Sequence, residues 1–204
     1  MLQFRNLMLI TILGFSSFAA TTALAAGGLF VEPMLTYERG DSTLEYPAPF
    51  LNSTGTISGV GLGARVGAHV NEVIFLALDA RYAKPNFKNS SNNLDASSAS
   101  YNYGPAVGVQ TPLIGLRVWG SYVLGGELDP EESNNVDLKF TQAQGYRVGV
   151  GFQIIMLSLN LEYQDLKYGS TKVEKVGPFA ASASDNINLK NKSYILSVSF
   201  PLEF

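Results

Sequence analysis

Cysteine is absent from the 204-residue chain, which excludes disulfide bonds as a source of stability and excludes a lipid-modified N-terminal cysteine. Histidine occurs once, and the chain has no cluster of metal ligands, no nucleophile motif and no glycine-rich phosphate loop. We therefore predict no metal, no cofactor and no enzymatic activity. Basic residues are few, 14 against 17 acidic ones, and they are scattered, so nothing in the sequence supports a nucleic-acid partner.

Long apolar runs are also missing. Beyond Ala25 no run approaches the roughly 20 residues that a transmembrane helix needs. If the mature chain crosses a membrane, strands closed into a barrel must do so, because an open sheet edge cannot lie in lipid.

The N-terminus has the three parts of a secretory signal peptide. Arg5 gives a positive region, residues 7–18 an apolar region, and Ala23-Leu24-Ala25 a small-x-small cleavage sequence. An uncleaved membrane anchor is the alternative, but the apolar run is short and is followed by small residues rather than by a charged stop. We predict that residues 1–25 are a signal peptide and that residues 26–204 form one domain.

The mature chain contains eight segments in which apolar and polar residues alternate with the period of a β-strand. The segments are 29–39, 56–68, 73–82, 101–109, 114–124, 137–154, 157–165 and 190–204. Very short links alternate with long polar connections over 40–55, 83–100, 125–136 and 168–189. Short turns at one end and long loops at the other are typical of an up-and-down barrel.

The charged residues within these segments share the face opposite to the apolar one. They are Glu32, Arg65, Asp79, Arg81, Arg117, Arg147 and Glu162. Shifting a strand by one residue would place its charge in lipid, at about 2 to 4 kcal/mol for an arginine at the midplane. Because an eight-stranded barrel has room inside for side chains and little else, we predict an interior plug of paired charges. A switchable gate or a proton path is the functional alternative.

The short turns predict specific neighbours for these charges. Arg147 would lie nearly opposite Glu162, and Arg65 would lie diagonal to Asp79. Three glycines would leave volume for long charged side chains. Gly63, Gly61 and Gly108 would face Asp79, Arg81 and Arg117, respectively.

Tyrosines gather at the long-loop ends of the segments and predict an aromatic girdle, with the ring in lipid and the hydroxyl in water. They are Tyr37, Tyr82, Tyr101, Tyr103, Tyr122, Tyr163 and Tyr194. The general preference of aromatic residues for strands is the alternative explanation. Phe30 and Phe75 do not fit the outward-facing positions.

The last segment keeps its apolar face to the final residue, through Tyr194, Leu196, Phe200, Leu202 and Phe204. This ending, the strand pattern and the loop asymmetry resemble those of small OmpA/OmpX-type outer-membrane barrels. The resemblance implies an all-β fold: a closed, eight-stranded, antiparallel, up-and-down transmembrane β-barrel with short periplasmic turns and long extracellular loops. It implies a bacterial outer-membrane location and makes the five-residue ending the C-terminal signal read by the barrel assembly machinery. A secreted lipocalin-like barrel, which would bury its apolar face, is the architectural alternative.

The resemblance does not select an activity, because this family includes envelope stabilisers, adhesins, small channels and a few lipid-modifying enzymes. We predict a structural or surface-interacting protein that is surrounded by outer-membrane lipids and contacts an extracellular partner through its long loops. A narrow channel for small or apolar solutes, similar to OmpW-type barrels, is the first alternative. A lipid-modifying enzyme is the second, although His69 lies at the short-turn end with no evident acidic orienter, which favours an interfacial histidine.

Overall fold

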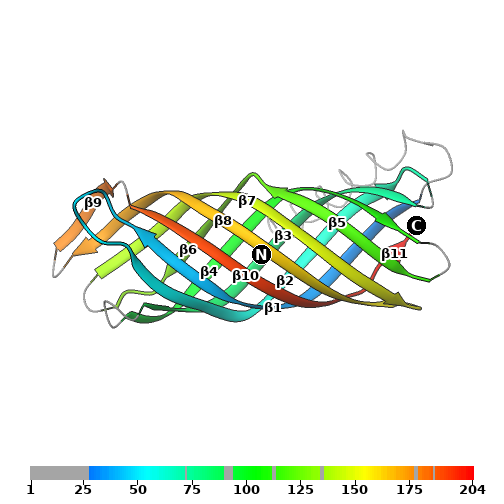
Figure 1. The fold of residues 1–204 in the computed structure, drawn as a ribbon, viewed down its shortest axis with the longest axis horizontal. Helices are drawn as coiled ribbons and strands as arrows, with labels where there is room; N and C mark the ends of the chain where they lie inside the picture. Colours follow the sequence, from blue (N-terminus) through cyan, green and yellow to red (C-terminus); the bar gives the residue numbers. More distant parts are fainter. Residues whose placement is uncertain are drawn as a thin grey trace, which may run out of the picture.

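Alternating apolar and polar residues form long β-strands that close into a barrel (Figure 1). The structure is a computed structural model that describes residues 28–71, 73–89, 94–111, 114–133, 136–176, 179–185 and 187–204. Its strands are β1 (Leu29–Glu45), β2 (Ser53–His69), β3 (Ile74–Asn89), β4 (Leu94–Gln110), β5 (Leu116–Val123), β6 (Gly125–Pro130), β7 (Val136–Ile154), β8 (Leu157–Val176), β9 (Phe179–Asp185), β10 (Asn188–Ser199) and β11 (Leu202–Glu203).

The barrel closes because β1 pairs with β2 on one side and with β10 on the other, all antiparallel. β5 and β6 are two parts of the fifth barrel strand, since each pairs with both β4 and β7. β10 and β11 are two parts of the eighth, interrupted at Phe200 and Pro201, where proline lacks a backbone N–H. β9 pairs with β8 beyond the ring. The predicted eight-stranded, antiparallel, up-and-down barrel is confirmed.

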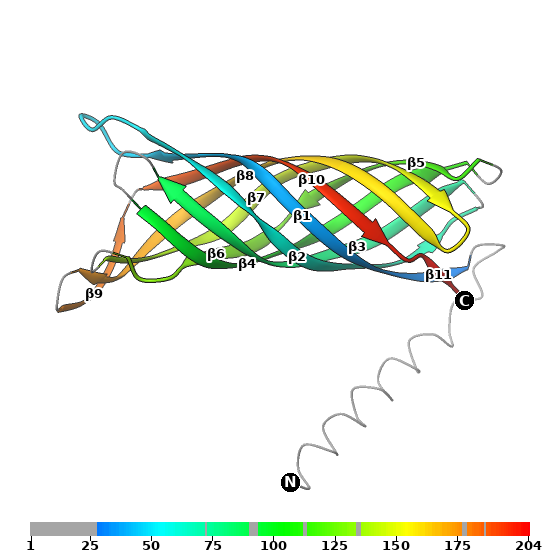
Figure 2. The same ribbon diagram turned by 90° about the horizontal axis from the view of Figure 1, so that it is seen from below.

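Short turns and the C-terminus occupy one end of the barrel, and the longer connections with β9 occupy the other (Figures 1 and 2). The strands run farther toward the long-loop end than the sequence predicts. β1 continues to Glu45 rather than ending at residue 39, and β3 continues to Asn89 rather than ending at residue 82. Much of each predicted loop is therefore an extended hairpin.

The physical reason is that the pattern inverts along the strands. On the short-turn side of the tyrosines, the outward-facing residues are apolar. On the long-loop side, the outward-facing residues are polar and the inward-facing residues are apolar. Leu44 and Ile57, for example, are 4% and 1% exposed. An apolar outer face therefore identifies only the part of a strand on the short-turn side of the inversion.

The central part of the barrel exposes a continuous band of apolar side chains. Leu35, Leu62, Leu78 and Val150 are 57%, 62%, 67% and 49% exposed, respectively. A lipocalin-like barrel would bury such residues, so this arrangement excludes that alternative. The predicted signal peptide, residues 1–25, lies outside the described residues. Among the residues that the structure describes, none forms a helix long and apolar enough to span a membrane.

Candidate functional site: the charged interior

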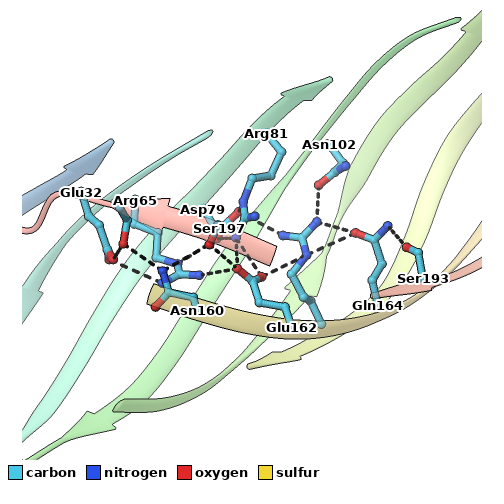
Figure 3. A network of polar contacts seen from close by, with 12 residues as sticks. Glu32, Arg65, Asp79, Arg81, Asn102, Asn160, Glu162, Gln164, Ser193 and Ser197 are labelled. Carbon is cyan, nitrogen blue, oxygen red and sulfur yellow. Dashed lines mark hydrogen bonds and ion pairs between the residues drawn. The ribbon is translucent and has the colours of Figure 1, made fainter. Parts of the chain in front are cut away.

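All seven charged residues that share the inner face in the sequence pattern lie inside the barrel, each at most 7% exposed. Hydrogen bonds and ion pairs join them into one network that spans the interior (Figure 3). They come from β1, β2, β3, β5, β7 and β8, so the network links six elements of the ring.

Asp79 is the centre of the network. Its carboxylate accepts hydrogen bonds from Arg65 Nε at 2.9 Å, from Arg81 Nε at 2.7 Å and from Arg147 Nη1 at 3.1 Å. Charge-assisted bonds of this length are the strong ones in protein interiors. One carboxylate thus accepts hydrogen bonds from three guanidinium groups.

Two glutamates complete the compensation. Glu162 accepts from Arg81 Nη2 at 2.9 Å and lies 3.6 Å from Arg147 Nε. Glu32 accepts from Arg117 through both of its oxygens, at 2.7 and 3.0 Å. Arg65 bridges the two groups, since its Nη1 lies 3.4 Å from Glu32 and its Nη2 lies 3.5 Å from Glu162. No arginine of the network is left without an acidic partner.

Glu38 is an eighth charged member, which the sequence interpretation left out of the network. Its Oε1 accepts from Gln164 Nε2 at 3.0 Å and from Ser193 Oγ at 2.6 Å, and Gln164 Oε1 in turn accepts from Arg147 Nη2 at 2.6 Å. Glu38 has the same strand parity as Glu32, which was the signal that could have identified it. With Glu38 included, four carboxylates balance four guanidinium groups.

Polar side chains satisfy further donors and acceptors of the network, although Arg81 Nη1 and Arg117 Nε are buried without a hydrogen-bond partner. Asn102 Oδ1 accepts from Arg147 Nη2 at 2.8 Å, and Ser199 Oγ donates to Glu32 at 2.6 Å. Asn160 donates to Ser197 and Ser199 at 3.2 and 2.9 Å. Sequence parity placed these small residues on the inner face but gave no reason to single them out.

The predicted neighbours of the charges are partly wrong. Arg65 lies directly opposite Asp79 rather than diagonal to it, and Arg147 faces Gln164, with Glu162 offset by two residues. The register of two paired strands depends on the position of the centre of the turn that joins them. The predicted pairs place the centre of the β2–β3 turn one residue too early, which shifts the predicted partner of every residue by two positions.

The predicted partners of the three glycines are wrong for the same reason. Gly63 faces Arg81, Gly61 faces Ala83, and Gly108 faces Trp119. A Cβ on Gly63 would still collide with the Arg81 side chain, so glycine does make room for a charge there.

An apolar layer closes the interior on the short-turn side of the network. It consists of Phe30, Phe75, Ala77, Ala106 and Trp119. Phe30 and Phe75, which did not fit the outward pattern, therefore face inward. The layer also holds the arginines by cation–π contact, with Arg65 Cζ 4.3 Å from the Trp119 ring.

A second apolar layer lies on the long-loop side. Its buried members are Leu44, Ile57, Phe87, Val123, Leu128, Phe140, Ala143, Leu166, Tyr168 and Leu189. Leu44, Phe87, Leu128, Tyr168 and Leu189 fall in connections predicted as loops, whereas Ile57, Val123, Phe140 and Ala143 lie in predicted strands but face inward with the polar residues. The charged layer is therefore enclosed between two apolar layers.

The seven predicted girdle tyrosines point outward from the barrel wall. Tyr37 and Tyr194, for example, are 45% and 63% exposed. Tyr163 packs between Tyr146 and Tyr194, with ring centroids 6.4 and 5.5 Å apart. Tyr146 belongs to this group by position, although the sequence interpretation did not include it.

The apolar residues of the C-terminal segment lie on the outer face. Tyr194 and Leu196 belong to β10 and Leu202 to β11, while Phe200 precedes the break and Phe204 follows β11. The backbone N–H of Phe204 donates to the Leu29 carbonyl at 2.8 Å, which joins the chain end to the first barrel strand. Recognition of this segment by the assembly machinery stays a prediction.

On the long-loop side of the tyrosines, the outer face carries exposed and partly exposed ion pairs. Hydrogen bonds from Lys88 and then Asn86 hold the pKa of the Asp95 carboxyl below its ordinary value. Hydrogen bonds to Glu127 and then Asp129 raise the pKa of Lys139 above its ordinary value. These pairs indicate that this part of the wall faces water.

His69 lies at the short-turn end, between aromatic rings. Its ring centroid is 5.0 Å from that of Phe30 and 6.1 Å from that of Phe75. No group of three or more histidine, cysteine or acidic residues among the described positions is arranged to hold a metal ion. The interior therefore offers a dense set of paired charges rather than an exposed reactive group.

The model of one protein family, described as the outer membrane protein beta-barrel domain, matches residues 8–200. No curated protein matches the chain. Among solved structures, OprG from Pseudomonas aeruginosa is 11% identical, with 88% of this chain and 97% of that chain covered and a TM-score of 0.52. Ail from Yersinia pestis is 12% identical, with 87% and 99% covered and a TM-score of 0.47. Neisserial surface protein A is 13% identical, with 84% and 96% covered and a TM-score of 0.44.

At such low identity the likeness to OprG concerns the fold alone. The family match, by contrast, spans nearly the whole chain and agrees with a closed barrel whose wall is apolar outside and charged inside. The chain therefore belongs to the outer membrane protein beta-barrel domain family and lies in the bacterial outer membrane.

Proposed function

We propose that this protein is a sealed, non-enzymatic outer-membrane barrel with a structural or surface-interacting role. The observation that carries the proposal is the three-layered interior: a charged network between two buried apolar layers. A solute crossing the barrel would have to displace the aromatic side chains of one layer, break the ion pairs, and then displace the second layer.

The energetics support a sealed interior. Arg65, Arg117 and Arg147 are at most 1% exposed and lie across the lumen. Moving such a group away from its carboxylates leaves an uncompensated buried charge, which costs several kcal/mol.

The long-loop end supports a surface role. β1 continues for eight residues from Tyr37 to Glu45, which at about 3.3 Å per residue and a tilt of about 40° corresponds to roughly 20 Å beyond the girdle. We call the part of the barrel wall on the long-loop side of the tyrosine girdle the crown; in β1 it comprises residues 38–45. Ion pairs such as Lys88–Asp95 and Lys175–Glu132 occupy its outer surface. Such a wall would hold the hairpin tips clear of the lipid headgroups, where an external partner can reach them.

The position of His69 supports a role without catalysis. A lipid-modifying enzyme of the outer leaflet would need its histidine near the tyrosine girdle, but this one packs against Phe30 and Phe75 at the opposite end. Overproduction of the protein should therefore leave outer-membrane lipid composition unchanged, as measured by mass spectrometry. Altered lipid A or phospholipid species would contradict the proposal.

Planar-bilayer recording tests the sealed interior. The purified barrel should show no discrete conductance, and neither should Arg147→Ala, because both apolar layers remain in place. Heat-modifiable mobility on a detergent gel confirms that each sample is folded before it is recorded. Discrete wild-type conductance that changes with Arg147→Ala would show instead that the interior conducts.

A further inference from the structure

The apolar band of the wall is short for a membrane. Tyr37 and Leu29 in β1, Tyr82 and Ile74 in β3, and Tyr146 and Ile154 in β7 are each separated by eight residues. At about 3.3 Å per residue and a tilt of about 40°, this separation spans roughly 20 Å. The lipid-facing band of such barrels is about 25 Å tall. If the tyrosines mark one border of that band, the other border lies about 5 Å beyond the strand ends, at the turns.

Two of the three turns at that end are apolar. Ile155 and Met156 in the β7–β8 turn are 88% and 66% exposed, and Ile114 in the β4–β5 turn is 61% exposed. The sequence has no charged residue at 111–115 or 155–156, whereas the β2–β3 turn contains Asn71 and Glu72. Residues facing water at a turn are ordinarily polar, so this composition suits a hydrocarbon border.

The β7–β8 turn shows that apolarity is kept at a conformational cost. Ile154 pairs with Leu157, so the turn has two residues, and Ile155 has a φ of 56°. A β-branched residue in this left-handed region is an outlier, and a two-residue hairpin turn with a positive φ at its first residue alone favours glycine there. Turn chemistry alone would not place isoleucine and methionine there.

A groove joins this turn to its neighbour and to the lipid-facing wall. It has a volume of about 560 Å³ and is lined by Ile114, Phe152, Gln153, Ile154 and Ile155, among others. Gln153 connects the two turns that line the groove. Its backbone N–H donates to the Gly115 carbonyl at 2.8 Å, and its Nε2 donates to the Ile155 carbonyl at 3.3 Å. Phe152 and Ile154 make the groove continuous with the apolar outer wall.

We propose that the β4–β5 and β7–β8 turns are submerged at the acyl-chain border of the periplasmic phospholipid leaflet, with the Ile155–Met156 turn and its groove in contact with phospholipid acyl chains. Continuity with the lipid-facing wall selects lipid over a periplasmic protein as the occupant. The barrel then sits asymmetrically, with these two turns within one leaflet and its crown well outside the other.

Spin labels test the depth directly, since the chain has no cysteine and each introduced one is unique. Met156→Cys is labelled and reconstituted in phospholipid vesicles. Val150→Cys on the outer wall serves as the lipid control, and Ser97→Cys on the crown serves as the water control. The label at 156 should collide with oxygen and avoid a soluble nickel chelate as the label at 150 does. Chelate collisions at the level of the label at 97 would place the turn in water and overturn the proposal.

A pair of turn variants tests the energetic contribution. Ile155→Gly with Met156→Asn installs a better turn but removes the apolar side chains, so the folding constant in vesicles should fall about tenfold or more. Ile155→Leu with Met156→Leu keeps the apolar surface and should fold like the wild type. Equal or better folding of the Gly-Asn variant would overturn the proposal. Neither result bears on the sealed interior, which the conductance recording tests separately.

Discussion

Asp79→Asn is the most informative single change in the interior. The carboxylate is 2% exposed and compensates three arginines, so the substitution leaves four buried guanidinium groups facing three carboxylates. Removing one partner of a buried ion pair costs about 3 to 5 kcal/mol. Since ordinary domains are stable by about 5 to 15 kcal/mol, the variant should still fold but with much of its stability lost.

The second half of this prediction concerns Arg147. Arg147→Gln in the Asp79→Asn background restores the charge balance at three against three, so about 1 to 3 kcal/mol of the loss should be recovered. The two single variants and the double variant form a thermodynamic cycle. Urea titration in phospholipid vesicles, followed by the mobility of unboiled samples on a detergent gel, measures all three.

Asp95→Asn is the matched control, because it removes the same group from an exposed pair on the crown. It should change the urea midpoint very little. If Asp79→Asn were no more destabilising than Asp95→Asn, or if the double variant lost the full sum of the single losses, the network would not be the coupled unit described above. All variants should remain silent in bilayer recordings, because the two apolar layers are intact.

Three further predictions test other parts of the molecule. Removal of Phe204 should impair assembly and leave chains in the periplasm, as fractionation would show, and a normal outer-membrane yield would contradict the predicted signal. Because its hydrogen bond with Lys88 holds the pKa of Asp95 below its ordinary value, the stability that this carboxyl contributes is present above its unfolded pKa and lost as pH falls through the folded one. An NMR titration of Asp95 should show the low midpoint, and Lys88→Gln should raise it. Gly149→Val should destabilise the barrel by about 1 to 3 kcal/mol in urea titration, because a Cβ there would meet the Trp119 ring, whereas Val148→Ile on the outer wall should be neutral.

The sequence predicts which face of its strand each residue occupies, but it does not predict which residue lies opposite on the neighbouring strand. Strand parity is a local property, so Glu32, Arg65 and Arg117 could be placed inside without knowledge of any other strand. Register depends on the centre of each turn, and an error of one residue moves a partner by two while it preserves the face. This is why Arg65 was correctly oriented yet assigned the wrong position relative to Asp79.

The crown could not be predicted for a different reason. An outward-facing apolar pattern does not identify the crown, because its apolar side chains, such as Leu44, Phe87 and Phe140, face inward. Both the membrane-spanning wall and the crown alternate with period two, but with opposite sign. Only the closed ring shows that Leu128 and Leu166, far apart in the sequence, pack into the same layer.

The layered interior also explains how charges can dominate the middle of a lipid-embedded barrel. Apolar layers on both sides keep water away from the ion pairs, which strengthens each Arg–carboxylate attraction but raises the cost of any unpaired group. Because removing one partner leaves an uncompensated buried charge, the complete network favours a single strand register. If the interior is sealed as we propose, contacts with external partners are left to the crown, where the outer surface of β3 and β4 carries exposed pairs such as Lys88–Asp95.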